Sequence, residues 1–198
     1  MAGSMADLRP DANGQNRPAG LGGDGRLWVF AYGSLIWKPE FDIASSHITR
    51  IHGYHRDFCL HSIEHRGTPE RSGLVLGLAP GGACRGVLFE VPARSALQAV
   101  ADLDERELAT TAYIPRALKV MGPHGPVFAR AYVCDRTHWQ FAGRLSIAQA
   151  AARIVGAVGR YGPNEDYVIQ TVKALRERAI HDERLEAIAA AVEHAMAP

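Results

Sequence analysis

The sequence predicts a mixed α+β domain built on an antiparallel sheet. Short apolar segments of strand length fill the chain from residue 27 to residue 91, and helical periodicity takes over in its last third. No helical segment joins the early strands, as the crossovers of a doubly wound parallel sheet would require. About 170 of the residues follow a leader poor in large apolar side chains, which is enough for one domain with a sizeable core.

That leader, residues 1–25, is rich in Gly, Ala, Asp, Asn and Pro. Such a segment cannot bury enough apolar surface to offset its ordering entropy, so we expect a disordered leader before a single domain at residues 26–198. A cloning remnant at residues 1–4, with Met5 as the natural start, is an alternative to a wholly native leader. The leader lacks the basic and apolar regions of a secretory signal, and nowhere does the chain approach the roughly 20 apolar residues of a membrane span.

Composition limits the classes of partner that this chain is expected to bind. The chain has 22 Lys+Arg against 21 Asp+Glu, and no basic run is interleaved with aromatic residues. We therefore expect neither nucleic acid nor a membrane as a partner. Cys59, Cys84 and Cys134 are widely spaced within apolar segments, which favours core thiols of a reduced cytoplasmic protein over a disulfide framework. A cysteine nucleophile remains an alternative, although no local motif marks one.

The first element is the apolar run at residues 27–37, LWVFAYGSLIW, which is interrupted by Gly33 and Ser34. It predicts a buried strand that ends in a tight loop. Such a loop can present consecutive backbone N–H groups to an anion or to a developing oxyanion. An ordinary turn is the alternative, and the Gly-Ser pair by itself favours it.

Short strands follow. Apolar segments at 48–54 and 56–61 flank Gly53, and segments at 74–79 and 86–91 flank a Pro80-Gly81-Gly82 turn signal. They predict four antiparallel strands. His61 and His65 would share one face of a helix and could bind a metal there, but the surrounding pattern is that of a strand and a loop. We expect no metal site.

A helix is predicted next. Ser95 and Gln98 have the spacing of a capping box, so the helix should begin at Ala96. At 100° per residue its buried stripe contains Ala96, Leu97, Val100, Leu103 and Leu108.

Two carboxylates of this helix point inward. Glu107 falls near the middle of the apolar stripe and is favoured, whereas Asp104 lies towards its edge. Burial of a carboxylate costs several kcal/mol unless it is neutralised or paired, and it raises the pKa towards the range of a general base. The alternative is that Glu107 turns out to solvent or pairs with a core arginine such as Arg56, and periodicity leaves both open.

The rest of the chain predicts a hairpin and three helices. Strands at 116–121 and 127–134 are joined by a Gly- and Pro-rich link. Helical patterns cover residues 146–160, 165–178 and 182–195, with Ser146 and Asp182 as N-caps.

Four segments in the right order resemble one known family. WVFAYGSLIWKP at 28–39 resembles the opening motif of the ChaC-type gamma-glutamylcyclotransferases, the glutathione-degrading branch of that superfamily. HRGT at 65–68 and YGPNEDYV at 161–168 resemble segments that border the family's cleft. LDERE at 103–107, followed by Tyr113, resembles the segment whose Arg-Glu pair carries the catalytic acid/base, a role that falls on Glu107.

This chain departs from the family pattern at two places. Ala31 replaces a glycine that commonly precedes the Tyr-Gly-Ser-Leu core. Thr110-Thr111-Ala112 stands where relatives often have a Gly-Gly pair before the tyrosine, so we expect a stiffer loop there.

The resemblance implies a cyclotransferase-like fold, a mostly antiparallel barrel-like sheet with flanking helices. It implies a carbon–nitrogen lyase of the amidine-lyase class that cleaves glutathione to 5-oxoproline and Cys-Gly without a cofactor. The substrate-binding residues implied by it are Ala31, Tyr32, Gly33, Ser34, Leu35, Ile36, Arg56, Tyr113 and Tyr167.

Several alternatives remain at this point. Other gamma-glutamyl amines or dipeptides could be the substrate, or the domain could bind a ligand without catalysis. Ser34 as an acyl nucleophile is the rival mechanism. Asn164 could be only a helix cap, and Tyr167 only a core aromatic residue with a satisfied hydroxyl.

Overall fold

The computed structural model describes residues 9–10 and 16–197. Its main sheet has five strands in the order β4-β5-β3-β7-β6. Neighbouring strands are antiparallel except for β3 and β7, which are parallel. The strands are β3 (Leu27–Ala31), β4 (Ser45–Ser62), β5 (Gly73–Val91), β6 (Tyr113–Gly122) and β7 (Gly125–Cys134). The predicted α+β class is therefore confirmed.

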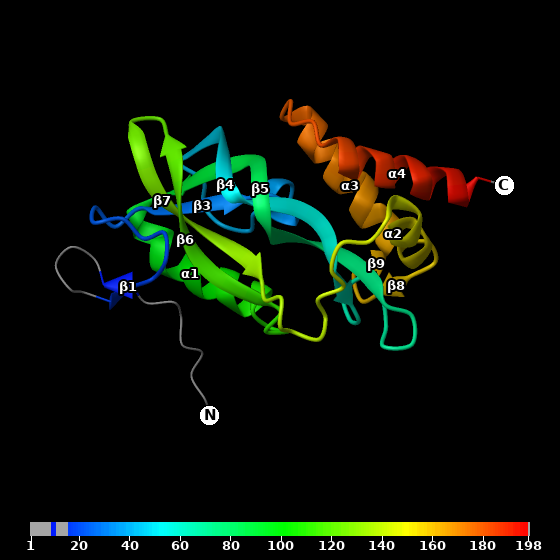
Figure 1. Cartoon of the computed structure of the whole chain (residues 1–198). Helices are drawn as coiled ribbons and strands as arrows, with labels where there is room; N and C mark the ends of the chain where they lie inside the picture. Colours follow the sequence, from blue (N-terminus) through cyan, green and yellow to red (C-terminus); the bar gives the residue numbers. More distant parts are fainter. Residues whose placement is uncertain (1–8, 11–15, 198) are drawn as a thin grey trace.

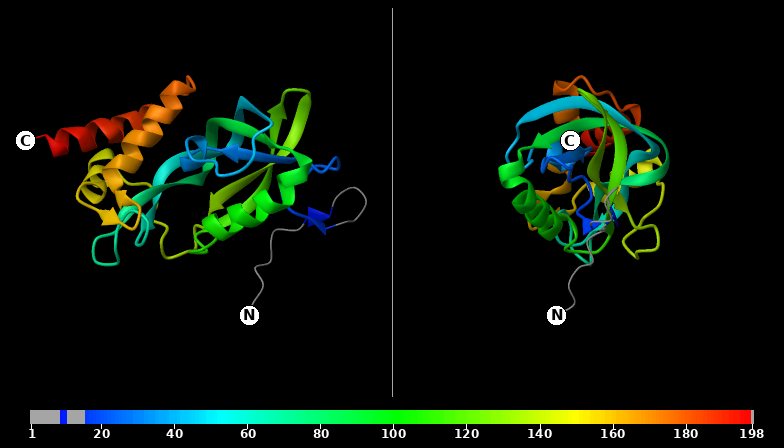
Figure 2. Two further views of the ribbon diagram at one scale, coloured as in Figure 1. Left: turned by 180° about the vertical axis from the view of Figure 1, so that it is seen from behind. Right: turned by 90° about the vertical axis from the view of Figure 1, so that its left-hand side faces the viewer.

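The sheet curls until its outer strands meet. Thr49 Oγ1 on β4 donates a hydrogen bond of 2.8 Å to the backbone oxygen of Met121 on β6. The end-on view in Figure 2 shows the resulting barrel-like shape. Strand β3 is the central strand of this sheet, and all five of its residues are buried. The turn that follows β3 therefore has a fixed starting point.

The turn predicted at Pro80-Gly81-Gly82 is wrong. The strands predicted on either side of it form the single long strand β5, and those on either side of Gly53 form β4. The two pair along almost their whole lengths, with a register shift between His52 and Tyr54. Gly53, Gly81 and Gly82 have positive φ. The glycines therefore accommodate a bulge that bends a continuous ribbon, which local sequence cannot distinguish from a turn.

In the described ranges, four α-helices complete the fold: α1 (Ala93–Glu107), α2 (Ile147–Ile154), α3 (Asn164–Glu177) and α4 (Glu183–Met196). Helix α1 packs on the sheet, whereas α2, α3 and α4 gather at the other end with the small hairpin of β8 (Val158–Gly159) and β9 (Gly162–Pro163) (Figure 1). The predicted N-caps are confirmed, because Ser146 forms a capping box with Gln149 and Asp182 accepts from the Leu185 N–H. Helix α2 ends at Ile154, short of the predicted residue 160, and the β8–β9 hairpin begins at Val158.

The predicted start of α1 is wrong. The helix begins at Ala93 after Pro92, and no side chain caps it. Ser95 Oγ donates to the Pro92 oxygen, and Gln98 pairs with Asp102 instead of closing a capping box. A proline that fixes φ at the N-terminus serves as the entry instead.

The buried face of α1 also differs in part. Ala96, Ala99, Val100 and Leu103 are buried, whereas Leu97 is 67% exposed. Leu97 follows Ala96 by 100° around the helix, so it lies at the edge of the stripe and outside the core.

The predicted disorder of the leader fails in the part of it that can be described. Residues 1–8 and 11–15, with the suggested cloning remnant, lie outside the described residues. Strand β1 (Arg9–Pro10) pairs with β2 (Asn16–Arg17). Ala19 is buried, and the Trp28 N–H donates to the Gly20 oxygen at 3.0 Å. Gly20 has a φ of +86°, and a Cβ there would lie 2.5 Å from the Arg130 nitrogen. Backbone contacts at small residues thus order this segment without large apolar side chains.

The three cysteines are free and buried, as predicted. Cys59 Sγ and Cys134 Sγ lie 3.4 Å apart. The contact with Cys134 and burial raise the pKa of the Cys59 thiol. A thiol held in this protonated state is a poor nucleophile, which argues against the cysteine mechanism.

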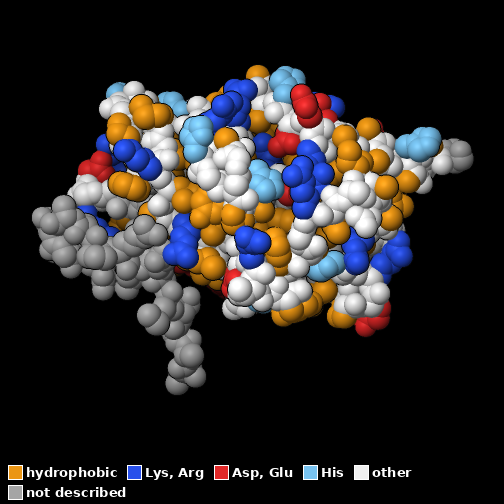
Figure 3. Space-filling model, in the orientation of Figure 1, with side chains coloured by type: hydrophobic (Ala, Val, Ile, Leu, Met, Phe, Trp, Pro, Cys, Tyr) orange, Lys and Arg blue, Asp and Glu red, His pale blue; other side chains and the backbone are white. Residues whose placement is uncertain are grey.

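No helix in the described ranges is long and apolar enough to cross a membrane. On the face drawn in Figure 3, basic and acidic side chains are scattered among apolar ones.

Candidate active site

A cleft of about 800 Å³ opens beside the end of β3. Its walls come from the turn after β3, the last residues of α1, the loop after β4 and the first half of α3. A small recess of about 30 Å³ shares four of its lining residues, Ser34, Glu107, Tyr113 and Tyr167. The recess is lined by Tyr32, Gly33, Ser34, Leu35, Leu76, Glu107, Tyr113, Tyr132 and Tyr167.

The turn after β3 is a short 3₁₀ helix, Ser34–Ile36. The Ile36 N–H donates to the Gly33 oxygen at 2.9 Å, and the Lys38 N–H donates to the Ser34 oxygen at 2.8 Å. The first N–H groups of a helix have no intrahelical acceptor. Within the described part of the chain, the N–H groups of Ser34 and Leu35 have none elsewhere either. The turn therefore presents unused backbone donors beside the recess.

Glu107 is the last residue of α1, and its side chain is only 16% exposed. It lines both the recess and the cleft, so the predicted inward position is confirmed. Its Oε1 lies 3.2 Å from Arg106 Nε, and no ion pair with Arg56 forms. Burial raises the pKa of the Glu107 carboxyl, Arg106 opposes the rise, and Glu40 adds to it. Such a carboxylate is suited to exchanging protons near neutral pH.

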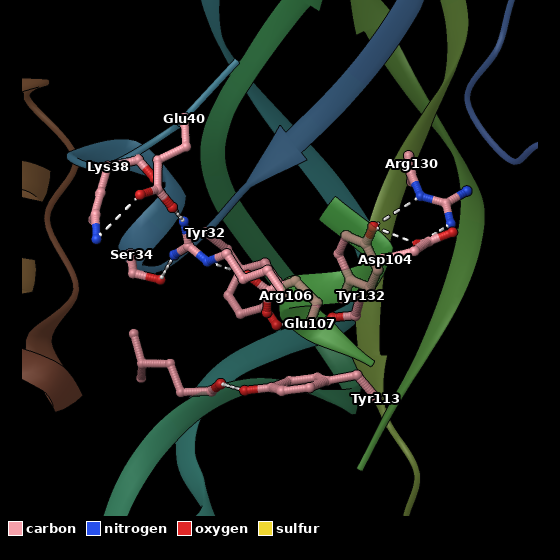
Figure 4. Close-up of polar contacts among 11 residues, drawn as sticks. Tyr32, Ser34, Lys38, Glu40, Asp104, Arg106, Glu107, Tyr113, Arg130 and Tyr132 are labelled. Atoms are coloured by element: carbon pink, nitrogen blue, oxygen red, sulfur yellow. Dashed lines mark hydrogen bonds and ion pairs between the residues drawn. The ribbon is translucent and has the colours of Figure 1, made fainter. Parts of the chain in front are cut away.

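Arg106 fixes the geometry around Glu107. Its Nη1 donates to the Lys38 oxygen at 2.9 Å and to Glu40 Oε2 at 2.7 Å, and its Nη2 donates to Ser34 Oγ at 2.9 Å (Figure 4). One guanidinium thus ties the turn after β3 to the end of α1. A guanidinium cannot accept the Ser34 hydroxyl proton, which argues against Ser34 as an acyl nucleophile.

Four tyrosines line the recess, and three of them, Tyr32, Tyr113 and Tyr167, belong to the implied binding set. Tyr32 OH donates to the Tyr132 oxygen at 2.8 Å, and Tyr113 OH donates to the Leu76 oxygen at 2.6 Å. Tyr167 OH accepts from the Leu76 N–H at 3.4 Å. Burial raises the pKa of all three phenols, that of Tyr167 to about 12. They remain neutral near pH 7 and so supply polar contacts without charge.

A second arginine–carboxylate pair lies behind the recess. Arg130 on β7 is fully buried and forms an ion pair with Asp104 on α1. Tyr132 OH donates to the same Asp104 oxygen at 2.7 Å, and Arg130 Nε donates to Tyr132 OH at 3.0 Å (Figure 4). The Asp104 side chain thus points inward as predicted, but its carboxylate already accepts hydrogen bonds from Arg130 and Tyr132.

Three residues of the implied binding set do not reach the cleft or the recess. Ala31 and Ile36 are buried beside them. Arg56 is buried elsewhere, where its Nη1 donates to the Tyr32 oxygen at 2.7 Å and its Nε pairs with Asp182. Its influence on the site therefore passes through the backbone of Tyr32. The other six residues of the set line the recess.

Asn164 and Tyr167 connect α3 to the strand below the recess. The Asn164 amide accepts from the Leu74 N–H at 2.6 Å and donates to the Leu74 oxygen at 2.8 Å. It forms no cap hydrogen bond, so the helix-cap interpretation is wrong. Tyr167 packs edge-on against Phe58 and also lines the recess, so it is both a core and a cleft residue.

Sequence periodicity missed Arg106, because it singled out only the inward carboxylates Asp104 and Glu107 on this helix. The signal that could have identified it is the Arg-Glu pair of the family motif. The HRGT segment does border the cleft, through His65 and Arg66. Among the described residues, no cluster of three or more His, Cys, Asp or Glu could hold a metal.

Comparison with known proteins gives the family. A model of the family described as ChaC-like protein matches residues 27–195. The chain belongs to the ChaC-like family. A protein of Schizosaccharomyces pombe named glutathione-specific gamma-glutamylcyclotransferase is 34% identical, with 84% of this chain and 94% of that protein covered. The protein of the same name from Escherichia coli K12 is 29% identical, with 88% and 76% covered.

A solved structure supports the fold of this ChaC-like protein. The crystal structure of a yeast gamma-glutamyl cyclotransferase specific to glutathione matches with a TM-score of 0.78 at 22% identity. The match covers 86% of this chain and 96% of that chain. The cyclotransferase-like fold implied by the sequence motifs is therefore confirmed.

Proposed function

We propose that this ChaC-like protein is a gamma-glutamylcyclotransferase that converts glutathione to 5-oxoproline and Cys-Gly. The observation that carries the proposal is the Glu107 carboxylate, 16% exposed and with a raised pKa, at the wall of a recess beside unused backbone N–H groups. The relatives named glutathione-specific gamma-glutamylcyclotransferases support glutathione as the substrate.

The reaction is intramolecular. The α-amine of the glutamyl group attacks its own γ-amide carbonyl carbon, and the new C–N bond closes a five-membered lactam. The C–N bond to cysteine then breaks, and the electron pair stays on the departing nitrogen. Glu107 accepts the proton that the attacking amine loses and returns it to that nitrogen, so the reaction needs neither water nor a cofactor.

Other groups lower the barrier in different ways. The backbone N–H groups of Gly33, Ser34 and Leu35 hold the charge that develops on the carbonyl oxygen, where one donor contributes roughly 3 kcal/mol in other enzymes. Tyr32, Tyr113 and Tyr167 enclose the glutamyl group with uncharged polar contacts. Holding the substrate folded for cyclisation supplies much of the remaining rate, as expected for an intramolecular attack.

Two features bear on the setting of this enzyme. Its three cysteines are free, as in proteins of reducing compartments, and this supports the cytoplasm as its location. The near balance of charges supports a small-molecule substrate and not nucleic acid as the partner.

A substrate panel tests the proposal. Purified protein would be incubated with reduced glutathione and with gamma-Glu-Ala, and the products would be identified by mass spectrometry. We expect equal amounts of 5-oxoproline and Cys-Gly from glutathione and a slower reaction of gamma-Glu-Ala. If only gamma-Glu-Ala is cyclised, the mechanism stands and the substrates are other gamma-glutamyl dipeptides. If neither compound reacts, a non-catalytic binding domain is favoured.

A further inference from the structure

In the part of the chain that the structure describes, the wide part of the cleft contains one arginine, Arg66, that forms no ion pair. Four Lys and Arg side chains line the cleft. Lys38 pairs with Glu40 at 3.1 Å, and Arg160 pairs with Glu64 at 3.7 Å. Arg106 pairs with both Glu40 and Glu107. Arg66 forms no ion pair with any described residue, although Asp166 is near enough to act on its pKa.

Arg66 is partly buried, and aromatic and backbone contacts fix its orientation. Its guanidinium lies over the Tyr167 ring, 5.5 Å from the centroid, and its Nη1 donates to the Pro163 oxygen at 3.0 Å. Tyr167 in turn lines the recess that holds Glu107. A guanidinium has five N–H donors, so several remain for a ligand in the cleft.

The backbone that carries Arg66 is held on two sides. The Arg66 N–H donates to Ser62 Oγ at 2.9 Å, and the Tyr161 N–H donates to the His65 oxygen at 3.0 Å. A Cβ at Gly159 would lie 2.6 Å from the backbone nitrogen of Arg66, so the β8–β9 hairpin packs directly against this loop. The guanidinium is therefore preorganised, which reduces the entropy lost when a ligand binds.

The histidines of the cleft do not duplicate this charge. Burial lowers the pKa of both His61 and His65; at His65 the Glu64 carboxylate opposes this shift and neighbouring arginines add to it. Both imidazoles are therefore mostly neutral at pH 7. Among the described residues that line this wall, Arg66 is left with a positive charge free to bind an anion.

We propose that Arg66 binds the terminal carboxylate of the departing peptide and so makes the site select gamma-glutamyl peptides over gamma-glutamyl amines. The inference rests on the proposed cyclotransferase function. Arg66 lines the wide cleft but not the recess of Glu107, so it faces the part of a substrate that extends beyond the reacting amide. Planar guanidinium and carboxylate groups form paired, charge-assisted hydrogen bonds.

Two substrates and two variants test this proposal. The substrates are glutathione and its C-terminal glycinamide, which differ only in the terminal charge. The variants are Arg66→Gln and, as a matched control, Arg160→Gln, which removes a cleft arginine that already pairs with Glu64. Steady-state kinetics would separate KM from kcat, and circular dichroism would verify folding of both variants.

For the wild type we expect a KM at least about tenfold higher for the glycinamide than for glutathione, with kcat changed much less. Arg66→Gln should raise the KM of glutathione by a similar factor and leave that of the glycinamide nearly unchanged. Arg160→Gln should leave both close to wild type.

Equal KM values for the two substrates in the wild type would overturn the proposal, whatever the variants do. An equal loss on both substrates in Arg66→Gln would also overturn it, because Arg66 would then act on the glutamyl end or on the fold. If the wild type converts neither substrate, the proposed cyclotransferase function fails instead. Calorimetric binding of glutathione and its glycinamide to wild type and Arg66→Gln would then still test the subsite, by the same factors in Kd.

Discussion

Asp104 and Glu107 lie one turn apart at the end of α1, and each contacts an arginine, yet their surroundings differ. Asp104 accepts from Arg130 and Tyr132, and Arg130 is fully buried. Glu107 has one arginine contact at 3.2 Å, lines an open cleft and has a raised pKa. The first carboxylate is occupied by protein partners, whereas the second retains the capacity to exchange a proton.

The comparison shows that partners, and not helix position, separate a structural carboxylate from a reactive one. Arg130 approaches Asp104 from β7 and is enclosed by the core. Arg106 comes from the same helix as Glu107, and it divides its donors among Ser34, Lys38, Glu40 and Glu107. We therefore expect each variant below to change one of two properties, stability or catalysis, much more than it changes the second.

The largest effect on stability is expected from Asp104→Asn. The change leaves the Arg130 charge buried with Tyr132 as its remaining side-chain partner. Breaking a buried ion pair by removing one partner costs about 3–5 kcal/mol, so the free energy of unfolding should fall by that amount. Urea denaturation followed by circular dichroism would measure it. A loss below about 1 kcal/mol would show that the pair contributes little to the fold.

Arg106→Gln should mainly affect catalysis. It removes the contacts that tie Ser34 and Lys38 to α1, so we expect kcat/KM to fall by about ten- to a hundredfold. It also removes the positive charge that lowers the pKa of Glu107. The acidic limb of the kcat profile, where Glu107 becomes protonated, should therefore move to higher pH. A limb that stays in place or moves to lower pH would contradict the assignment of that limb to Glu107.

A smaller effect is expected on the stability of Glu107→Gln, and it should depend on pH. Burial raises the folded-state pKa of Glu107 above its ordinary value of 4.5. The wild type therefore loses stability as the pH rises from about 4.5 through the folded-state pKa, whereas glutamine does not titrate. Thermal melts should show the variant more stable than the wild type at pH 8, with no advantage at pH 4.

Glu105→Gln is the matched control for that experiment, because Glu105 is an exposed carboxylate of the same helix. It should show no comparable gain at pH 8. If Glu107→Gln were less stable than the wild type at pH 8, the carboxylate would contribute to the fold and would not resemble the reactive group described above.

Local sequence patterns predicted the strands, helix caps and buried faces correctly where the tertiary environment favours the same structure as the pattern. The apolar run of β3, the caps at Ser146 and Asp182 and the inward face at Glu107 follow from short-range rules. It failed at Pro80, because a bulged continuous strand and a turn require the same residues. It also failed at Ser95, because Pro92 supplied an earlier helix start.

The contacts that define the site could not be predicted from local patterns. Arg106 reaches Lys38 and Ser34 across about 70 residues of sequence, and Arg56 turns out to support Tyr32 from within the core. Periodicity gives the face of a helix on which a side chain lies but not the partner it meets there. Periodicity and the family motif favoured Glu107 over Asp104, but only the tertiary contacts show that Asp104 is paired with Arg130 and Tyr132.

The most direct test of the central claim is the rate of 5-oxoproline formation from glutathione by wild type and Glu107→Gln, measured by NMR on folded protein. If the Glu107 carboxylate transfers the proton, kcat should fall by about a hundred- to ten-thousandfold in the variant. The wild type should release Cys-Gly and 5-oxoproline in equal amounts. A Glu107→Gln protein that forms 5-oxoproline at the wild-type rate would contradict the account.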